Sequence, residues 1–252
     1  MSSDVNAEPR GRSAVVVLEA VSRIFGSGVN AVAALDAVSV DFSKGVFTAI
    51  MGPSGSGKTT LLQCAAGIDR PSSGRVQIGG VTLADLSEKQ LAVLRRRRVG
   101  FVFQSFNLLG SLTAEGNVAL PLRLDGRRPK RAAVREALDR VGLGDRMRHR
   151  PAELSGGQQQ RVAIARALVT SPEVVFADEP TGALDSTSSR SVLDALRGLV
   201  DAFGQTVVMV THDPVAATRA DRVIFMADGK LTGALEHPSA EQVAERLSQL
   251  GD

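Results

Sequence analysis

The chain of 252 residues contains no tryptophan, no tyrosine and a single cysteine, Cys64. One cysteine excludes an internal disulfide, and such sparse use of cysteine is typical of proteins in a reducing compartment. Arginine-rich clusters at residues 95–98, 127–131 and 146–150 could bind nucleic acid or an anionic membrane surface. Because no aromatic residues lie among them, and because the chain has no tryptophan or tyrosine on which bases could stack, we expect solvated faces and no nucleic-acid partner.

The sequence also lacks an apolar run near the roughly 18 residues that a membrane-spanning helix requires. Asp4 and Glu8 stand where a secretory signal would carry positive charge, and the apolar run at residues 14–18 is too short for the core of one. We therefore expect a cytoplasmic protein. The polar residues 1–12 predict a disordered lead-in.

The most informative stretch, residues 52–59, reads Gly-Pro-Ser-Gly-Ser-Gly-Lys-Thr and fits the phosphate-binding pattern G-x-x-x-x-G-K-[ST] at every fixed position. The apolar residues 46–51 predict a buried strand before it, and residues 60–66 predict the start of a helix after it. Glycines let such a loop aim backbone N–H groups at a triphosphate, and the helix adds its positive N-terminal dipole. Lys58 is expected to reach the β- and γ-phosphates, and Thr59 to offer its hydroxyl to Mg²⁺. The nucleotide-binding residues predicted here are Gly52, Pro53, Ser54, Gly55, Ser56, Gly57, Lys58, Thr59 and Thr60.

Two adjacent carboxylates follow a predicted strand later in the chain. The apolar residues 174–177 end in Asp178 and Glu179, at the strand end where parallel α/β sheets bind their ligands. We expect Asp178 to hold Mg²⁺ through water and Glu179 to act as the general base that activates the attacking water. The alternative interpretation is that these two carboxylates end the strand and have no functional role.

Three further motifs are ambiguous when each is taken alone. His212 follows a predicted strand and either contacts the γ-phosphate or is structural. Gln104 also follows a strand, where its amide could accept from Mg²⁺-bound water or simply face solvent. Residues 154–158, Leu-Ser-Gly-Gly-Gln, precede a helix and form either a second anion site or a capping sequence.

Strands and helices alternate from residue 158 onwards, which predicts a parallel sheet covered on both sides. Short strands before residue 50 predict a small, mostly antiparallel sheet, with Phe25 in a loop. The expected strands include residues 31–34, 38–42, 99–103, 174–177, 206–210 and 223–226. The expected helices include residues 87–97, 158–169, 187–200 and 239–250.

A segment of different character interrupts this alternation. Residues 105–124 are rich in apolar side chains without strand alternation, and Gly116 and Pro121 break the pattern. Pro129 then starts a helix with one apolar face. We predict a helical lobe inserted into an α/β domain, in which most apolar side chains pack inside and some form an exposed docking patch. The apolar residues concerned are Phe106, Leu108, Leu109, Leu112, Val118, Leu120 and Leu122.

The candidate motifs occur together and in one order along the chain. That order is Gly52–Thr59, Gln104, Leu154–Gln158, Asp178–Glu179, Ala183–Asp185 and His212. It resembles the ATP-binding subunits of ABC transporters, and Leu154–Gln158 is the marker of that superfamily. The resemblance covers nearly all of residues 14–232. Residues 102–109, 117–121, 155–167 and 179–182 are similar to the lipoprotein-release and macrolide-export branch, the LolD, MacB and FtsE type.

The resemblance implies an α/β fold of defined organisation. It has a P-loop NTPase (RecA-like) core with a parallel sheet, an N-terminal antiparallel β subdomain and an inserted α-helical subdomain. The ATPase domain would span residues 13–232, of which 104–157 form the helical subdomain and 13–103 and 158–232 form the rest. Residues 233–252 would form a C-terminal helical tail.

The resemblance also assigns roles to residues. The cofactors would be ATP and Mg²⁺, with Glu179 as the base, His212 on the γ-phosphate and Gln104 sensing the metal and linking to the permease. Thr59, Gln104 and Asp178 would form the metal site. Phe25 matches an adenine-stacking aromatic that is more usually tyrosine in the family. The remaining implied nucleotide contacts are Ser155, Gly156, Gly157, Gln158 and Asp185.

The partners follow from the same resemblance. Ser155 would cover the ATP held by Lys58 of a second copy, so that two ATP molecules join a head-to-tail pair. An integral-membrane permease would hold the pair at the inner face of the cell membrane, either for transport or, as the alternative, to regulate a non-transporting partner such as a cell-wall hydrolase regulator. The chain departs from the branch at Ala183, where asparagine is frequent, and at Gly110, where proline is frequent.

Overall fold

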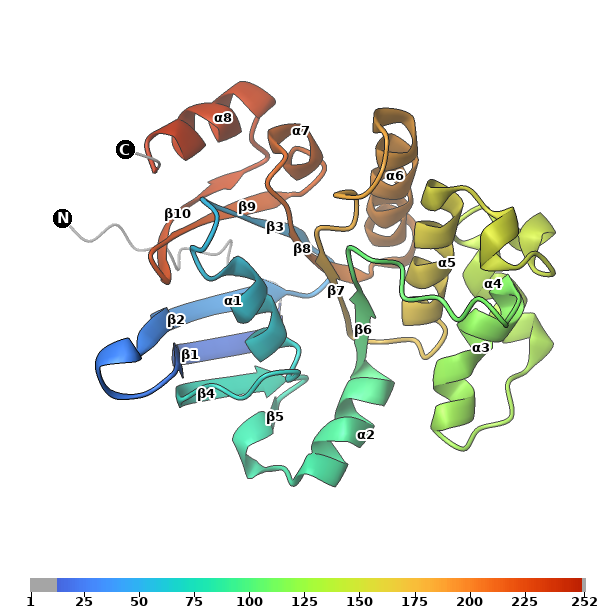
Figure 1. The fold of residues 1–252 in the computed structure, drawn as a ribbon, viewed down its shortest axis with the longest axis horizontal. Helices are drawn as coiled ribbons and strands as arrows, with labels where there is room; N and C mark the ends of the chain where they lie inside the picture. Colours follow the sequence, from blue (N-terminus) through green and yellow to red (C-terminus); the bar gives the residue numbers. More distant parts are fainter. Residues whose placement is uncertain (1–12, 251–252) are drawn as a thin grey trace.

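The computed structural model describes residues 13–250, so the predicted lead-in at residues 1–12 lies outside the described part of the chain. Two β-sheets and the helices packed on them organise this part (Figure 1). The larger sheet contains β3 (Phe47–Met51), β6 (Val99–Val102), β7 (Val174–Asp178), β8 (Thr206–Val210), β9 (Arg222–Ala227) and β10 (Lys230–Glu236). The smaller sheet contains β1 (Ala14–Phe25), β2 (Val32–Ser43), β4 (Ser73–Ile78) and β5 (Val81–Thr82). The helices are α1 (Lys58–Ala65), α2 (Glu88–Arg98), α3 (Ala114–Leu124), α4 (Arg131–Asp139), α5 (Gly156–Leu168), α6 (Ser186–Phe203), α7 (Pro214–Ala217) and α8 (Ala240–Ser248).

The larger sheet has the strand order β10-β9-β3-β8-β7-β6, and its neighbouring strands are parallel except for β10. Its central strands β3, β8 and β7 are mostly apolar and buried along their length, as expected of a parallel sheet covered on both faces. Side chains alternate between the faces, so that Val207 and Met209 belong to one core and Val208 and Val210 to the other. The predicted parallel sheet is confirmed.

Different elements cover the two faces of this sheet. On one side, α1 and the smaller sheet contribute Leu61, Leu18 and their neighbours to a shared core. On the other side, α3, α5 and α6 contribute Val118, Ile164 and Leu196. Figure 1 accordingly shows β1, β2 and β4 beside α1, while α3, α4 and α5 lie together beyond β6 and β7. The β subdomain and the helical subdomain therefore pack on opposite faces of one central sheet.

The smaller sheet is antiparallel throughout, as predicted, with the strand order β2-β1-β4-β5. Two details of the prediction are wrong. Residues 32–34 and 38–42 belong to one long strand, β2, which begins after Ala31 and continues past Ala37 although this residue has a positive φ of 48°. Phe25 is the last residue of β1 and pairs with Val32, so it does not lie in a loop. Register shifts between β1 and β2 absorb the irregularity that the sequence pattern suggests as a break.

Helix α3 runs through both residues that are expected to interrupt it. Gly116 and Pro121 lie inside the helix, and Thr113 caps it by accepting a hydrogen bond from Gly116 N. The helix persists because its apolar face is buried in the core against α5, with Val118 fully buried. Tertiary packing here outweighs the local cost of a proline, which removes one backbone donor.

The loop before α3 is closed by a fully buried side chain. Asn117 accepts a hydrogen bond from Leu109 N at 2.8 Å and donates to three backbone oxygens. Of the apolar residues in this segment, Val118 and Leu122 are buried, and Leu109 is exposed. The other four are half-buried, so the expectation that most pack inside is met only in part, and the docking role of the accessible ones stays a prediction.

The C-terminal region contains a strand that the sequence analysis does not foresee. Strand β10 runs across the predicted boundary between residues 232 and 233 and pairs with β9, so that part of the predicted tail belongs to the larger sheet. Helix α8 follows with Ser239 in a capping box and with Val243 buried, as the amphipathic pattern predicts. Helix α5 begins at Gly156, so the predicted subdomain boundary at residue 158 falls inside it. Among residues 13–250, no helix combines the length and apolar character needed to cross a membrane.

Two of the arginine clusters do more than face solvent. Arg96, Arg97 and Arg127 converge on the carboxylate of Asp125, whose side chain is only 2% exposed. Because Arg96 and Arg97 end α2 while Asp125 follows α3, the cluster joins the two helices. The interpretation of these clusters as purely solvated faces is therefore wrong at these positions.

Candidate nucleotide-binding site

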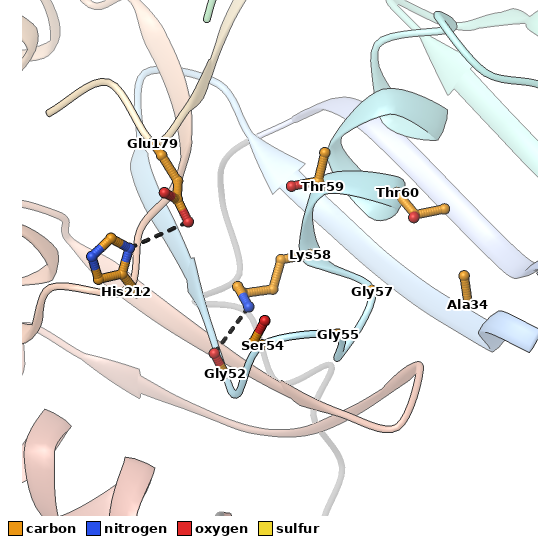
Figure 2. A pocket seen from close by; sticks show the side chains of 10 residues that line it. All are labelled: Ala34, Gly52, Ser54, Gly55, Gly57, Lys58, Thr59, Thr60, Glu179 and His212. Carbon is orange, nitrogen blue, oxygen red and sulfur yellow. Dashed lines mark hydrogen bonds and ion pairs between the residues drawn. The ribbon is translucent and has the colours of Figure 1, made fainter. Parts of the chain in front are cut away.

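A cavity of about 520 Å³ opens where the β3–α1 loop meets the ends of β7 and β8 (Figure 2). Its lining residues are Ala34, Gly52, Ser54, Gly55, Gly57, Lys58, Thr59, Thr60, Glu179 and His212. All of them except Ala34 are predicted site residues, drawn from three segments far apart in the sequence. The parallel sheet assembles them because the carboxyl ends of its strands meet at one edge.

The β3–α1 loop depends on glycine where the backbone approaches other segments. Gly57 has a φ of 96°, and a Cβ there would lie 2.2 Å from the carbonyl oxygen of Ala34. A Cβ on Gly52 would lie 2.0 Å from the carbonyl oxygen of Met226. Helix α1 begins directly after Gly57, and no side chain caps it. Its first N–H groups and its dipole therefore remain available to an anion.

Lys58 is buried and folds back onto its own loop. Its Nζ donates hydrogen bonds to Gly52 O at 2.9 Å and to Pro53 O at 2.7 Å, as Figure 2 shows for Gly52. Burial lowers the pKa of this ammonium group, while the carboxylates of Glu179 and Asp178 act in the opposite direction. A buried cation that has mainly neutral carbonyl partners offers a strong binding group to a phosphate.

Asp178 lies at the end of β7, and its Oδ1 accepts a hydrogen bond from Thr59 Oγ1 at 3.1 Å. Burial raises the pKa of the Asp178 carboxyl, and the adjacent Glu179 raises it further, while Thr59 and Lys58 lower it. Hydroxyl, carboxylate and amide oxygens are the ligands that Mg²⁺ prefers. A divalent cation next to Asp178 and Thr59 would offset two neighbouring carboxylates, so the residues present fit the metal.

The described residues contain no group of three or more histidine, cysteine or acidic side chains that could hold a metal by themselves.

Glu179 has a constrained position between Asp178 and the following proline. Its φ is 45°, a left-handed conformation that is unusual for a residue with a side chain, and its backbone N donates to Val210 O at 3.0 Å. Its Oε1 lies 3.3 Å from Nδ1 of His212, and the two side chains face each other in Figure 2. The ends of β7 and β8 thereby aim a carboxylate and an imidazole into the same cavity.

Gln104 reaches this region from the loop after β6. A Cβ placed on Gly182 would lie 2.8 Å from Gln104 Nε2 and 3.3 Å from Glu179 Oε2. The two side chains therefore flank Gly182 closely. The structure brings Gln104 to the same edge of the sheet as Glu179, as predicted.

Besides Gln104, six predicted site residues belong to segments that contribute no lining residue to this cavity. Ser155, Gly156, Gly157 and Gln158 form the start of α5, where Ser155 and Gln158 cap the helix reciprocally. Asp185 caps α6, and the backbone N–H groups of Ser188 and Thr187 lower the pKa of its carboxyl. Phe25 is exposed, with the guanidinium of Arg23 4.5 Å from the centre of its ring.

The Ser155 run contributes no lining residue to the cavity of its own chain, and the expectation that it covers a nucleotide bound by a second copy stays a prediction. The guanidinium group of Arg23 already lies over the Phe25 ring. A contact of Phe25 with adenine stays a prediction.

Sequence analysis missed Gln160, a fully buried glutamine of α5 whose amide lies between the loops after β6 and β7. The available signal was its spacing from the buried residues Ala163, Ile164 and Ala167, which places it on the apolar face of the helix. It also missed Ala34, because the approach of β2 to the phosphate loop depends on tertiary structure.

A phosphate-binding loop between a strand and a helix, facing two carboxylates at a parallel strand end, defines a nucleoside-triphosphate-binding protein of the P-loop class. Residues 35–182 match the family model described as ABC transporter, and the chain belongs to this family.

Curated relatives include two macrolide export ATP-binding/permease proteins. MacB 1/2 of Paracoccus denitrificans is 49% identical over 219 residues, which cover 86% of this chain and 33% of that protein. MacB of Marinobacter nauticus is 47% identical over 248 residues, which cover 94% of this chain and 38% of that protein. The chain thus spans little more than a third of the length of these relatives.

Similar solved structures cover most of the chain. The ATP-binding cassette MJ0796, solved as a dimer in a post-hydrolysis state with ADP and Pi, is 40% identical with a TM-score of 0.79, and the match covers 89% of this chain and 99% of that one. The cbiO1 protein of Clostridium perfringens, part of the ABC transporter complex cbiONQ, is 29% identical with a TM-score of 0.80, and the match covers 93% and 92% of the two chains.

Proposed function

We propose that this chain is the ATP-binding and ATP-hydrolysing motor of an ABC transporter, and that it works as a pair of identical subunits. The observation that carries this proposal is the cavity in which the phosphate loop, Glu179 and His212 meet. The similarity to a cassette that was solved with ADP and Pi supports ATP as the nucleotide.

In the proposed reaction, the backbone of the β3–α1 loop and the N-terminus of α1 hold the β- and γ-phosphates, and Lys58 turns from its loop carbonyls to the phosphate oxygens. Glu179 accepts the proton of the attacking water, and His212 contacts the γ-phosphate beside it. Thr59, Asp178 and Gln104 would hold Mg²⁺, which neutralises charge on the phosphates when bound.

We also propose that a second copy completes each site. The Ser155 run contributes no lining residue to the cavity of its own chain, and a helix N-terminus is a suitable cover for a phosphate group. The dimeric form of the MJ0796 structure supports this arrangement. ATP would then join the two copies, and hydrolysis would let them separate.

The proposed partner is an integral-membrane permease of the type found in the LolD, MacB and FtsE branch, which would place the motor at the inner face of the membrane. The name ATP-binding/permease of the curated relatives supports it. Regulation of a non-transporting membrane partner is the alternative. Co-purification from membranes tests the partner, and a transported-substrate assay in vesicles separates transport from signalling.

The shared site is tested by mixing two inactive variants. Lys58→Ala should disable the phosphate loop, and Ser155→Arg should disable the N-terminus of α5. Neither homodimer then has a complete site. A mixed dimer has one complete site, made from Lys58 of one chain and Ser155 of the other. We expect the mixture to regain ATPase activity that neither variant has alone, and a mixture as inactive as its components would contradict the proposal.

A further inference from the structure

The side chain of Gln160 ties together the two loops that carry Gln104 and Glu179. Its Nε2 donates a hydrogen bond to Phe103 O at 3.0 Å and another to Pro180 O at 2.8 Å. Phe103 directly precedes Gln104, and Pro180 directly follows Glu179. One amide group in α5 therefore fixes the backbone next to both of these side chains.

The orientation of this amide follows from its partners. Both are carbonyl oxygens, so only the NH₂ end of Gln160 can face them. The side chain is fully buried, and its own Oε1 has no hydrogen-bond partner among the described residues. An unpartnered buried oxygen is costly for stability. A side chain that bears this cost while it holds two loops suits a role in positioning better than a role in folding.

The same helix holds the Gln104 loop at a second point. Arg166 donates from Nη1 to Asn107 O at 2.5 Å and from Nη2 to Phe106 O at 3.0 Å. Asn107 has a positive φ of 50°, so the loop turns sharply at the residue whose carbonyl oxygen accepts the hydrogen bond from Arg166. Helix α5 begins with the Ser155 run, and its side chains thus connect that helix to the loops that carry Gln104 and Glu179.

We propose that Gln160 is a positioning residue that sets Glu179 and Gln104 for hydrolysis without taking part in nucleotide binding. The inference rests on the proposed roles of these two residues. Its donors hold the backbone directly before Gln104 and directly after Glu179, whereas the phosphate loop is built from other elements. Loss of the donors should therefore affect the rate of the chemical step and leave the affinity for ATP unchanged.

The first test is Gln160→Met, which keeps the length of the side chain and removes both donors. Steady-state ATPase assays on the whole chain should show kcat lowered by about tenfold or more, since small misplacements of reacting groups have effects of this size. KM for ATP should stay within about twofold of the wild-type value. The variant also removes the unpartnered Oε1, which offsets part of the lost hydrogen bonding and favours retention of the fold.

Gln205→Met is the matched control. Gln205 also donates from Nε2 to two backbone oxygens, those of Pro172 and Thr206, but it lies at the opposite end of β8 from the cavity. Loss of its donors should leave both kcat and KM within about twofold of wild type. If kcat of Gln205→Met fell as far as kcat of Gln160→Met, the loss of any such amide donor would lower the rate, and the inference would be overturned.

Gln160→Glu gives an independent readout through pH. A buried carboxylate facing two carbonyl oxygens has a raised pKa, and only its protonated form can donate to one of them. The ratio of kcat for Gln160→Glu to kcat for the wild type should therefore rise as the pH falls from 8 to 6. A ratio that is constant over this range contradicts the inference. If Gln160→Met does not fold, Gln160→Glu provides the test in its place.

The inference and the proposed function fail in different ways. If Glu179→Gln abolishes turnover while Gln160→Met keeps wild-type kcat, Gln160 has no positioning role and the proposed function stands. If Glu179→Gln keeps wild-type turnover, the proposed role of the base is wrong and the inference is lost with it. A raised KM with unchanged kcat for Gln160→Met would place Gln160 in nucleotide binding and overturn the inference alone.

Discussion

Thr59 donates a hydrogen bond from its Oγ1 to Oδ1 of Asp178 at 3.1 Å, although 119 positions separate the two residues in the chain. The bond joins the first turn of α1 to the end of β7, which are the two elements that carry the phosphate loop and the proposed base. This hydrogen bond lowers the pKa of Asp178, but burial and the neighbouring Glu179 raise it by more, so that the pKa of Asp178 remains raised. The nucleotide-free site therefore holds a carboxylate at a cost to stability.

Asp178→Asn tests this cost. A raised pKa in the folded state means that the ionised carboxylate is less favourable in the folded than in the unfolded chain at neutral pH. We expect the nucleotide-free variant to unfold at a higher temperature than the wild type at pH 7.5, because the amide carries no charge and can still accept from Thr59. The measurement is thermal unfolding without Mg²⁺ or nucleotide.

The pH dependence supplies the control for this variant. As the pH falls through the raised pKa of Asp178, the wild-type carboxyl becomes neutral and its penalty disappears. The difference in melting temperature should therefore shrink towards acidic pH. A variant that is less stable than the wild type at pH 7.5 would show that the carboxylate stabilises the fold.

Glu179→Gln should separate binding from chemistry. The amide cannot accept the proton of the attacking water, so turnover should fall by about 10²- to 10⁴-fold. The phosphate loop is unchanged, so ATP should still bind, and because hydrolysis is blocked, a dimer should accumulate on a sizing column in the presence of ATP. Near-normal hydrolysis would remove Glu179 from the role of base.

Lys58→Ala should weaken nucleotide binding. The ammonium group would make charged hydrogen bonds to phosphate oxygens, and the loss of such bonds costs roughly 1.5–3 kcal/mol, which corresponds to about a 10- to 100-fold rise in Kd for ATP. Isothermal titration calorimetry measures the Kd for ATP directly. Lys44→Ala, at an exposed turn residue before β3, is the control and should leave Kd unchanged. Equal affinity in the two variants would contradict the proposed role of the loop.

The sequence predicts the parts of this site that depend on local pattern. Residues 46–51 and 174–177 are short apolar runs that end in loop or acidic residues, so the local pattern alone indicates both the strands and the groups at their ends. The parallel sheet then requires these ends to meet. The cavity, which Lys58, Glu179 and His212 line together, confirms that step.

Features that depend on packing could not be predicted in this way. The breakers Gly116 and Pro121 suggest that residues 105–124 are interrupted, but burial against α5 keeps α3 intact. Strand β10 is half-buried along most of its length, and its pattern gives no strong alternation. Gln160 looks like one more polar residue in a run of three glutamines, and only the tertiary structure shows that carbonyl oxygens of two distant loops surround its amide.

The cluster around Asp125 leads to a prediction on the stability of the helical subdomain. Arg127, Arg97 and Arg96 approach this carboxylate at 3.0, 3.2 and 3.3 Å and link the end of α2 to the end of α3. Although burial acts to raise it, the pKa of Asp125 is lowered, because Arg97 and Arg96 donate hydrogen bonds and Arg127 adds its charge. Asp125→Asn should therefore lower the melting temperature at pH 7.

The sign of the pH effect distinguishes this cluster from the site. A carboxyl whose pKa is lowered on folding stabilises the protein above its unfolded value of 3.8, and that contribution is lost as the pH falls through the folded pKa. The deficit of Asp125→Asn should thus be full at pH 7 and should close only in the acidic range below that value. Asp145→Asn is the matched control, because its carboxylate pairs with Arg146 at 3.1 Å but is 70% exposed, and it should have little effect. Equal melting temperatures for the two variants would mean that the three arginines contribute no more than an ordinary surface ion pair.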